Sequence, residues 1–131
     1  MIILDTCALI FDALKPDRLT QRAKKTIEDA EQKSMIFCSD ISLWEIAMYV
    51  QKKRLELSTD TNKFLQLMLN ARHIQVLPIN SEIAAISCEE NLFTHGDPAD
   101  RIIAATTIYH QAKLITSDSK LKNIASLDII W

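Results

Sequence analysis

The chain has 131 residues, of which 48% are hydrophobic and 24% charged, with one glycine and three prolines. This length and balance predict one compact domain spanning residues 1–131 and exclude a disordered or fibrous chain. The formal net charge of -2 lacks the basic excess that nucleic-acid-binding domains often carry, so any polyanion must be held by a local patch or through bound cations.

The cysteines argue against a disulfide framework or a zinc site. There are three of them (Cys7, Cys38 and Cys88), an odd number with no Cys-x-x-Cys pair, which suits a reducing cytosol. The apolar start of the chain has no basic segment before it, unlike a signal peptide. No apolar run approaches the roughly 20 residues that cross a bilayer, so a cytoplasmic protein without membrane contact is expected.

Short apolar runs alternate with amphipathic segments in the first half of the chain. Pro16 separates the first two amphipathic segments, because proline ends a helix that precedes it. The periodicity predicts a buried strand at residues 1–4, helices at 6–14 and 18–33, a second buried strand at 35–38 and a helix at 42–54.

The second half continues the same alternation. Pro98 suits the first position of a helix, where a missing N–H costs nothing. The pattern predicts a helix at 59–72, a strand at 74–79, a helix at 80–90, a loop at 93–96, a helix at 97–111, a strand at 114–116, a short helix at 120–124 and a last strand at 127–131.

Strands that alternate with longer helices predict an α/β fold, with a mainly parallel sheet of four or five strands covered on both faces. In such sheets ligands bind beyond the carboxyl ends of the strands. Asp5 and Asp118 directly follow the first and fourth strands, whereas Glu45 and Asp100 lie in the first turns of helices, with Asp97 near Asp100. One crevice is therefore expected to collect these acids.

Clustered carboxylates repel one another, and a divalent cation relieves that repulsion. Mg²⁺ and Mn²⁺ prefer oxygen ligands and often use a few carboxylates together with water and substrate phosphate, whereas a site without His or Cys disfavours zinc. One or two such ions activate water and stabilise displacement at phosphorus. Acidic residues without a Ser–His pair fit phosphodiester hydrolysis better than acyl transfer.

Each acid also has a purely structural interpretation. Glu45 would complete a capping box that starts at Ser42. The acids at positions that suit a helix N-terminus are Asp97, Asp100 and Asp118. Asp5 is harder to explain in this way, because it follows an apolar strand where an unpaired carboxylate would be costly. Caps do not explain why all these acids should converge.

Five short motifs follow one another along the chain in the order found in a known protein family. They are ILDT at residues 3–6, SLWEIA at 42–47, DPADRIIAAT at 97–106, LITSD at 114–118 and a closing IIW at 129–131. This set resembles PIN-domain ribonucleases, in particular the VapC-type toxins of bacterial and archaeal toxin–antitoxin modules, over essentially the whole chain. The resemblance implies a three-layer α/β/α fold and a metal-dependent endoribonuclease that hydrolyses RNA with metal-activated water, leaving a 5′-phosphate and a 3′-hydroxyl.

The resemblance also implies site residues and partners. The catalytic, metal-holding acids would be Asp5, Glu45, Asp100 and Asp118, with Asp97 as an extra outer ligand of one or two Mg²⁺ or Mn²⁺ ions. The hydroxyls beside them are Thr6 and either Thr116 or Ser117. Weaker candidates for RNA contacts are Arg101, Lys120 and Lys122. The expected partners are RNA, a cognate antitoxin and a second copy of the chain in a homodimer.

The chain departs from the family at two places, and its residues also bear on other possible functions. Cys7 stands where relatives often have His, Asn or Ser, and the turn at residues 110–113 lacks the Gly of many relatives. A haloacid-dehalogenase-type phosphatase would need Asp at position 7, and a phosphoreceiver domain would need an Asp after the third strand. The remaining alternative is a catalytically silent PIN-like module that binds RNA or protein and shows no Mn²⁺-dependent stabilisation.

Overall fold

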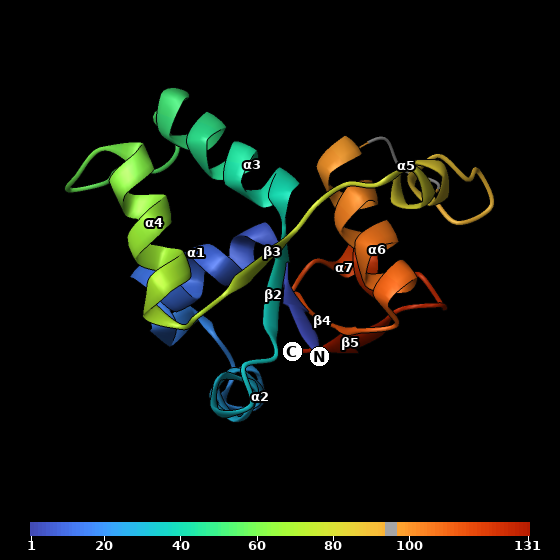
Figure 1. Ribbon diagram of the computed structural model, residues 1–131, viewed down its shortest axis with the longest axis horizontal. Helices are drawn as coiled ribbons and strands as arrows, with labels where there is room; N and C mark the ends of the chain where they lie inside the picture. Colours follow the sequence, from blue (N-terminus) through green and yellow to red (C-terminus); the bar gives the residue numbers. More distant parts are fainter. Residues whose placement is uncertain (94–96) are drawn as a thin grey trace.

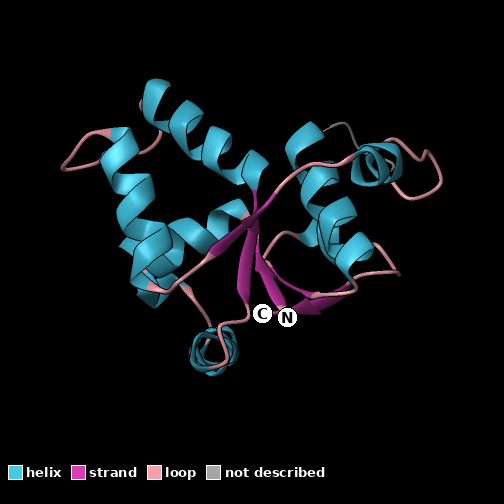
Figure 2. Cartoon of the chain, in the orientation of Figure 1, coloured by secondary structure: helices cyan, strands magenta, loops and turns pink. Residues whose placement is uncertain are grey.

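The computed structural model describes residues 1–93 and 97–131 and contains a five-stranded, all-parallel sheet (Figure 2). The strands are β1 (Ile2–Leu4), β2 (Ile36–Ser39), β3 (Gln75–Leu77), β4 (Lys113–Ile115) and β5 (Asp128–Ile130). Their order across the sheet is β3-β2-β1-β4-β5, so the first strand lies at the centre. The predicted parallel sheet is confirmed.

Helices cover both faces of the sheet, which confirms the three-layer α/β/α arrangement (Figure 1). One side carries α1 (Thr6–Leu14), α2 (Gln21–Gln32), α3 (Asp40–Gln51) and α4 (Thr61–Ala71). The other side carries α5 (Ser81–Ser87), α6 (Pro98–His110) and α7 (Ser119–Lys122). Two hydrophobic clusters, one on each side of the sheet, pack the helices against the strands.

Burial follows the position of each strand in the sheet. Ile3 and Leu4 in the central strand are fully buried, because β1 has a strand on each side and a helical layer on each face. Ile3 pairs in register with Phe37 of β2 and Leu114 of β4. β3 lies at the sheet edge and exposes Val76. The continuous apolar run at the start of the chain is thus explained by burial on all sides.

Several helix boundaries differ from those predicted, and capping explains the main differences. α3 begins at Asp40, earlier than residue 42, because the Ser39 hydroxyl accepts from the Ile41 N–H. The predicted helix at 18–33 is a 3₁₀ turn, η1 (Pro16–Arg18), followed by α2, whose first turn is capped by Thr20. α5 and α7 are also shorter than predicted, ending at Ser87 and Lys122.

Within residues 1–93 and 97–131, four helices are followed by non-glycine residues in the left-handed backbone region. The residues are Ser34, Lys53, His73 and Gln111, with φ values of 54°, 57°, 54° and 52°. Gln111 lies in the turn at residues 110–113, which contains no Gly. Because a Cβ makes this conformation unfavourable by about 1–2 kcal/mol, the rest of the fold must compensate at each position.

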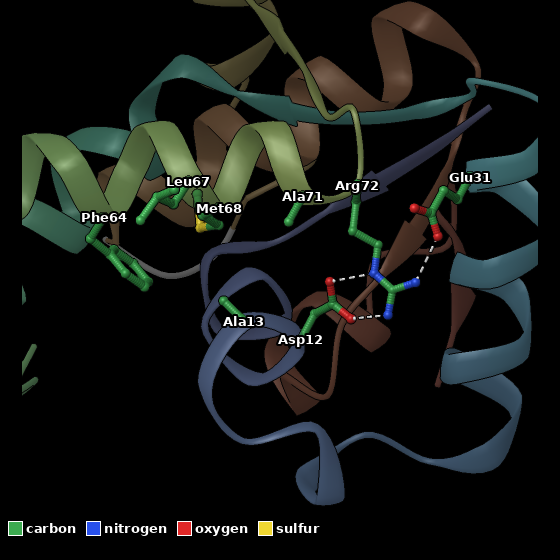
Figure 3. Close-up of a pocket in the computed structure, with 8 residues that line it drawn as sticks. All are labelled: Asp12, Ala13, Glu31, Phe64, Leu67, Met68, Ala71 and Arg72. Atoms are coloured by element: carbon green, nitrogen blue, oxygen red, sulfur yellow. Dashed lines mark hydrogen bonds and ion pairs between the residues drawn. The ribbon is translucent and has the colours of Figure 1, made fainter. Parts of the chain in front are cut away.

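An ion-pair network joins three helices on one side of the sheet (Figure 3). The Arg72 guanidinium, at the end of α4, donates two hydrogen bonds to Asp12 of α1 at 2.9 and 3.0 Å and one to Glu31 of α2 at 2.8 Å. These residues line a pocket of about 470 Å³ beside Phe64 and Leu67 of α4. Arg72 thereby fixes the orientation of α4 relative to α1 and α2.

No helix in the described residues is long and apolar enough to cross a membrane. Residues 94–96 of the loop expected at 93–96 lie outside the described part of the chain.

Candidate active site

Asp5 follows β1 at the carboxyl edge of the sheet and begins α1. Its Oδ1 accepts a hydrogen bond from the Ala8 N–H at 2.7 Å, and its Oδ2 accepts one from the Thr116 hydroxyl, which follows β4. The side chain is 5% exposed. Burial raises the pKa of Asp5 to about 6, against the effect of these two bonds and with smaller contributions from Asp118 and Glu45. The two hydrogen bonds therefore hold the carboxylate in place, while burial makes its ionised form less favourable than it would be in water.

Glu45 lies in the second turn of α3, and the prediction that it occupies a first turn is wrong. Ser42 is fully buried inside the helix, so the capping box proposed for these two residues does not form. Instead, the Glu45 carboxylate accepts hydrogen bonds from the Thr6 hydroxyl and, at 3.2 Å, from the Tyr49 hydroxyl. Burial is the main cause of its raised pKa. The helix thus presents Glu45 inward, toward the start of α1.

Asp97 and Asp100 both belong to the start of α6. Asp97 caps the helix, with its Oδ1 accepting from the Ala99 and Asp100 N–H groups at 3.0 and 3.2 Å. Burial raises the pKa of Asp100 to about 7, and repulsion from Asp97, Asp118, Glu45 and Asp5 adds to the shift. Asp100 therefore experiences the charge of every other predicted acid.

Asp118 follows β4 by three residues and caps α7. Its Oδ1 accepts from the Lys120 N–H at 2.8 Å, and its own N–H donates to the Thr116 hydroxyl oxygen at 3.0 Å. Since Thr116 also donates to Asp5, one buried hydroxyl connects the two acids. Of the two hydroxyls considered beside Asp118, Thr116 makes this connection, whereas Ser117 is exposed.

The remaining predicted residues surround this cluster. Lys120 and Lys122 are exposed on α7, and Arg101 is half-buried next to Asp100. Cys7 lies close to four of the acids, Asp5, Glu45, Asp100 and Asp118. Burial is the largest cause of the rise in the pKa of its thiol to about 11, and the four negative charges add to it. A thiol in this environment stays protonated at neutral pH.

Sequence reasoning missed two residues that support Glu45. Tyr49 was not among the predicted site residues, although it lies four residues after Glu45, on the same face of the helix. That spacing was the available signal. The Ser42 hydroxyl lies 3.0 Å from the Thr6 hydroxyl and so helps to orient the group that bonds Glu45. No local pattern indicates the Ser42 contact, because its partner is 36 positions away.

The donor set fits a hard divalent cation. It consists of carboxylate oxygens, and burial, with a smaller contribution from their mutual repulsion, raises the pKa of Asp100 and Asp5. Within residues 1–93 and 97–131, however, no three His, Cys, Asp or Glu side chains stand close enough together to hold an ion as they are oriented. The acids therefore share an electrostatic environment without forming a closed coordination shell.

Comparison with known proteins decides the family. A model of the PIN domain matches residues 2–127. The chain is a PIN-domain protein. This PIN domain is 30% identical over 122 residues to Ribonuclease VapC22 of Mycobacterium tuberculosis, which covers 93% of the chain and 90% of that relative. The chain is thus a homologue of a VapC-type ribonuclease.

Solved structures share the fold of this PIN domain. VapBC2 from Rickettsia felis, bound to a promoter DNA fragment, matches with a TM-score of 0.76 and 20% identity over 99% of this chain and 98% of that one. A toxin–antitoxin complex from Klebsiella pneumoniae matches with a TM-score of 0.65 and 18% identity over 100% and 97% of the two chains. The predicted PIN-like fold is confirmed.

Proposed function

We propose that this PIN domain is a Mg²⁺- or Mn²⁺-dependent endoribonuclease that acts in the cytoplasm as the toxin of a toxin–antitoxin pair. The observation that carries the proposal is the electrostatic environment of Asp100, on which Asp5, Glu45, Asp97 and Asp118 all act. These five acids come from four separate segments of the chain, and helix capping alone would not require them to meet. The homology to Ribonuclease VapC22 supports RNA as the substrate.

The residues of the cluster have different degrees of freedom. Asp5 and Glu45 are buried and held by the Thr116, Thr6 and Tyr49 hydroxyls, so they form the fixed part of the site. Asp100 and Asp118 are half-buried on helix N-termini, and Asp97 is exposed. We propose that these side chains turn toward Asp5 and Glu45 when an ion binds. The bound ion supplies Lewis acidity and an activated water for hydrolysis.

Basic side chains beside the acids would hold the RNA backbone. Lys120 and Lys122 extend from the helix that Asp118 caps, and Arg101 adjoins Asp100. A chain with a net charge of -2 needs such a local arrangement, because its overall field repels a polyanion. Hydrolysis at the acids would leave a 5′-phosphate and a 3′-hydroxyl.

A cognate antitoxin and a homodimer are the proposed protein partners. A fold neighbour from Klebsiella pneumoniae is itself a toxin–antitoxin complex. Phe64 and Met68 of α4 are buried in the core, whereas Leu67 on the same helix and Trp44 on α3 are 56% and 58% exposed. Leu67 and Trp44 are therefore the apolar side chains we assign to protein contacts.

The decisive experiment compares the purified parent with Asp5→Asn and Asp118→Asn on total RNA, in Mg²⁺, Mn²⁺ or chelator. We expect metal-dependent cleavage by the parent and its near-complete loss in both variants. Exposed Asp128→Asn, in β5, is the matched control and should cleave like the parent. Equal cleavage in chelator would refute the metal-dependent mechanism. A folded parent that neither cleaves RNA nor gains stability from Mn²⁺ would instead be the silent binding module.

A further inference from the structure

A second pocket lies beside the acidic cluster. It has a volume of about 380 Å³ and is formed by the segment after α5 together with α7 and the turn that follows it. We propose that this pocket binds one nucleotide of the RNA, next to the bond that is cut, and so contributes to the choice of cleavage sequence. The proposal rests on the ribonuclease function proposed above, and it assigns to Asn91 and Asn123 the recognition of the base.

The pocket is adjacent to the acidic cluster. Lys120 lines the pocket, and its backbone N–H donates to the Asp118 carboxylate at 2.8 Å. The pocket wall and the acidic cluster therefore share the same short helix, with one residue, Ser119, between the acid and the lysine. A nucleotide in the pocket would lie beside the phosphate at the acids, within reach of the Lys120 ammonium group.

The pocket is formed by a well-packed part of the chain. Ile124 and Leu92, which form the apolar part of the lining, pack in one hydrophobic cluster with the buried Leu121. The turn after α7 is closed by the Ile124 and Leu127 N–H groups, which donate to the Leu121 and Ile124 carbonyls at 3.1 Å each. The pocket is thus built on packed, hydrogen-bonded backbone and needs no rearrangement to exist.

The lining of the pocket matches the chemical groups of a nucleotide. A nucleotide offers an apolar base face, a base edge with donors and acceptors, and a charged phosphate. The pocket offers an apolar patch at Leu92 and Ile124, and the amides of Asn91 and Asn123, each of which both donates and accepts. Within the described residues, neither amide has a hydrogen bond to another protein group. Both are therefore available for a base edge, and Lys120 is available for a phosphate.

The lining also disfavours other ligands. None of the described residues that line the pocket is a carboxylate, although the acidic cluster is adjacent and the whole chain is net negative. A divalent cation would lack its preferred ligands there. An acidic peptide would meet one cation, Lys120, and little else that is positive. The volume falls in the range of sites for small molecules, which begins at about 300 Å³.

Binding is tested without relying on nuclease activity. The full-length, ¹⁵N-labelled protein is titrated with each of the four ribonucleoside 5′-monophosphates and, separately, with inorganic phosphate, while the asparagine side-chain amide signals are followed. We expect saturable shifts of Asn91 and Asn123 with at least one nucleotide, and no such shifts with phosphate. Asn70, exposed on α4, is the internal control and should not move. Shifts equal at all three residues, no shifts, or the same shifts with phosphate would each overturn the proposal.

Cleavage then tests the consequence for specificity. The parent, Asn91→Ala, Asn123→Ala and the control Asn70→Ala are incubated with a random-sequence RNA pool, and the bases beside each cut are counted. We expect the preference at one flanking position to fall by about 5- to 100-fold in the two pocket variants, which is the range for an amide–base pair, and to stay at the parental level in Asn70→Ala. An unchanged preference would overturn the specificity role. If the parent cuts no RNA, the ribonuclease proposal fails, and the titration still decides whether the pocket binds nucleotides.

Discussion

The Thr116 hydroxyl donates a hydrogen bond to the Asp5 carboxylate across 111 positions of sequence. The Thr116 side chain is completely buried. Its hydroxyl oxygen also accepts a hydrogen bond from the Asp118 N–H at 3.0 Å. Parallel pairing of β1 with β4 brings these residues together. One hydroxyl therefore sets the relative orientation of two acids at the carboxyl edge of the sheet.

Replacing Thr116 with Val should weaken divalent-ion binding by about 10- to 100-fold, the range found when a group that orients a metal ligand is removed. Val keeps the shape of Thr but not the hydroxyl, so Asp5 loses a bond that lowers its pKa. Mn²⁺ titration followed by calorimetry measures the effect. The control is Thr107→Val, since the buried Thr107 hydroxyl donates to the Ile103 carbonyl of its own helix. Equal Mn²⁺ affinity in both variants would show that Thr116 does not orient a metal ligand.

Without divalent ions, the protein should lose stability as the pH rises from about 4 to about 7. The pKa of Asp100 is raised from its ordinary 3.8 to about 7, and that of Asp5 to about 6. In this window the folded chain holds protons that the unfolded chain has released, so a rise in pH favours unfolding. Urea unfolding in chelator at several pH values measures the slope.

Two comparisons test this interpretation of the pH effect. Asp100→Asn should make the free energy of unfolding less dependent on pH at the upper end of this pH range, because the uncharged amide does not titrate. Saturating Mn²⁺ should stabilise the parent more at pH 7.5 than at pH 5, because the ion competes with protons for the carboxylates. A metal-free stability that rises between pH 5 and 7 would contradict the prediction.

Removing the Arg72 guanidinium should destabilise the fold by about 2–3 kcal/mol. Arg72→Met keeps most of the apolar stem but leaves the Asp12 carboxylate, with a side chain only 7% exposed, without its ionic partner. Urea unfolding gives the change in free energy. Lys25→Met breaks an exposed pair with Asp29 at 3.7 Å and should change stability by less than about 1 kcal/mol. A similar loss in both variants would mean that the Arg72 network does not stabilise the packing of α4.

Glycine at the left-handed helix ends should stabilise the protein. Lys53 has a φ of 57°, and Lys53→Gly relieves a steric cost of about 1 kcal/mol that the Cβ imposes there. The neighbouring Lys52 has a φ of -82°, so Lys52→Gly gains no such relief and should destabilise. The melting temperatures of the two variants should therefore move in opposite directions. Gln111→Gly should raise the melting temperature as Lys53→Gly does. A lower melting temperature in both Gln111→Gly and Lys53→Gly would refute the proposed backbone strain.

The alternation of apolar runs and amphipathic segments was enough to predict the parallel α/β sheet. Burial on both faces forces strands such as residues 1–4 to be continuously apolar, so the local pattern carries the global architecture. Asp5 and Asp118 were recognisable as site candidates for the same reason, since each follows a strand and the carboxyl ends of parallel strands share one edge. The homology of the motifs to PIN domains then indicated the reaction.

Contacts between distant segments were beyond local patterns. Ser42 and Glu45 have the spacing of a capping box, yet Ser39 caps α3 instead, and Glu45 turns inward to Thr6 and Tyr49. The choice between Thr116 and Ser117 likewise depended on which hydroxyl the β1–β4 pairing buries. Several chain conformations satisfy the hydrogen bonds of one helix end almost equally well. The packing of α3 and β4 against the rest of the molecule selects among them, because it alone removes these groups from water.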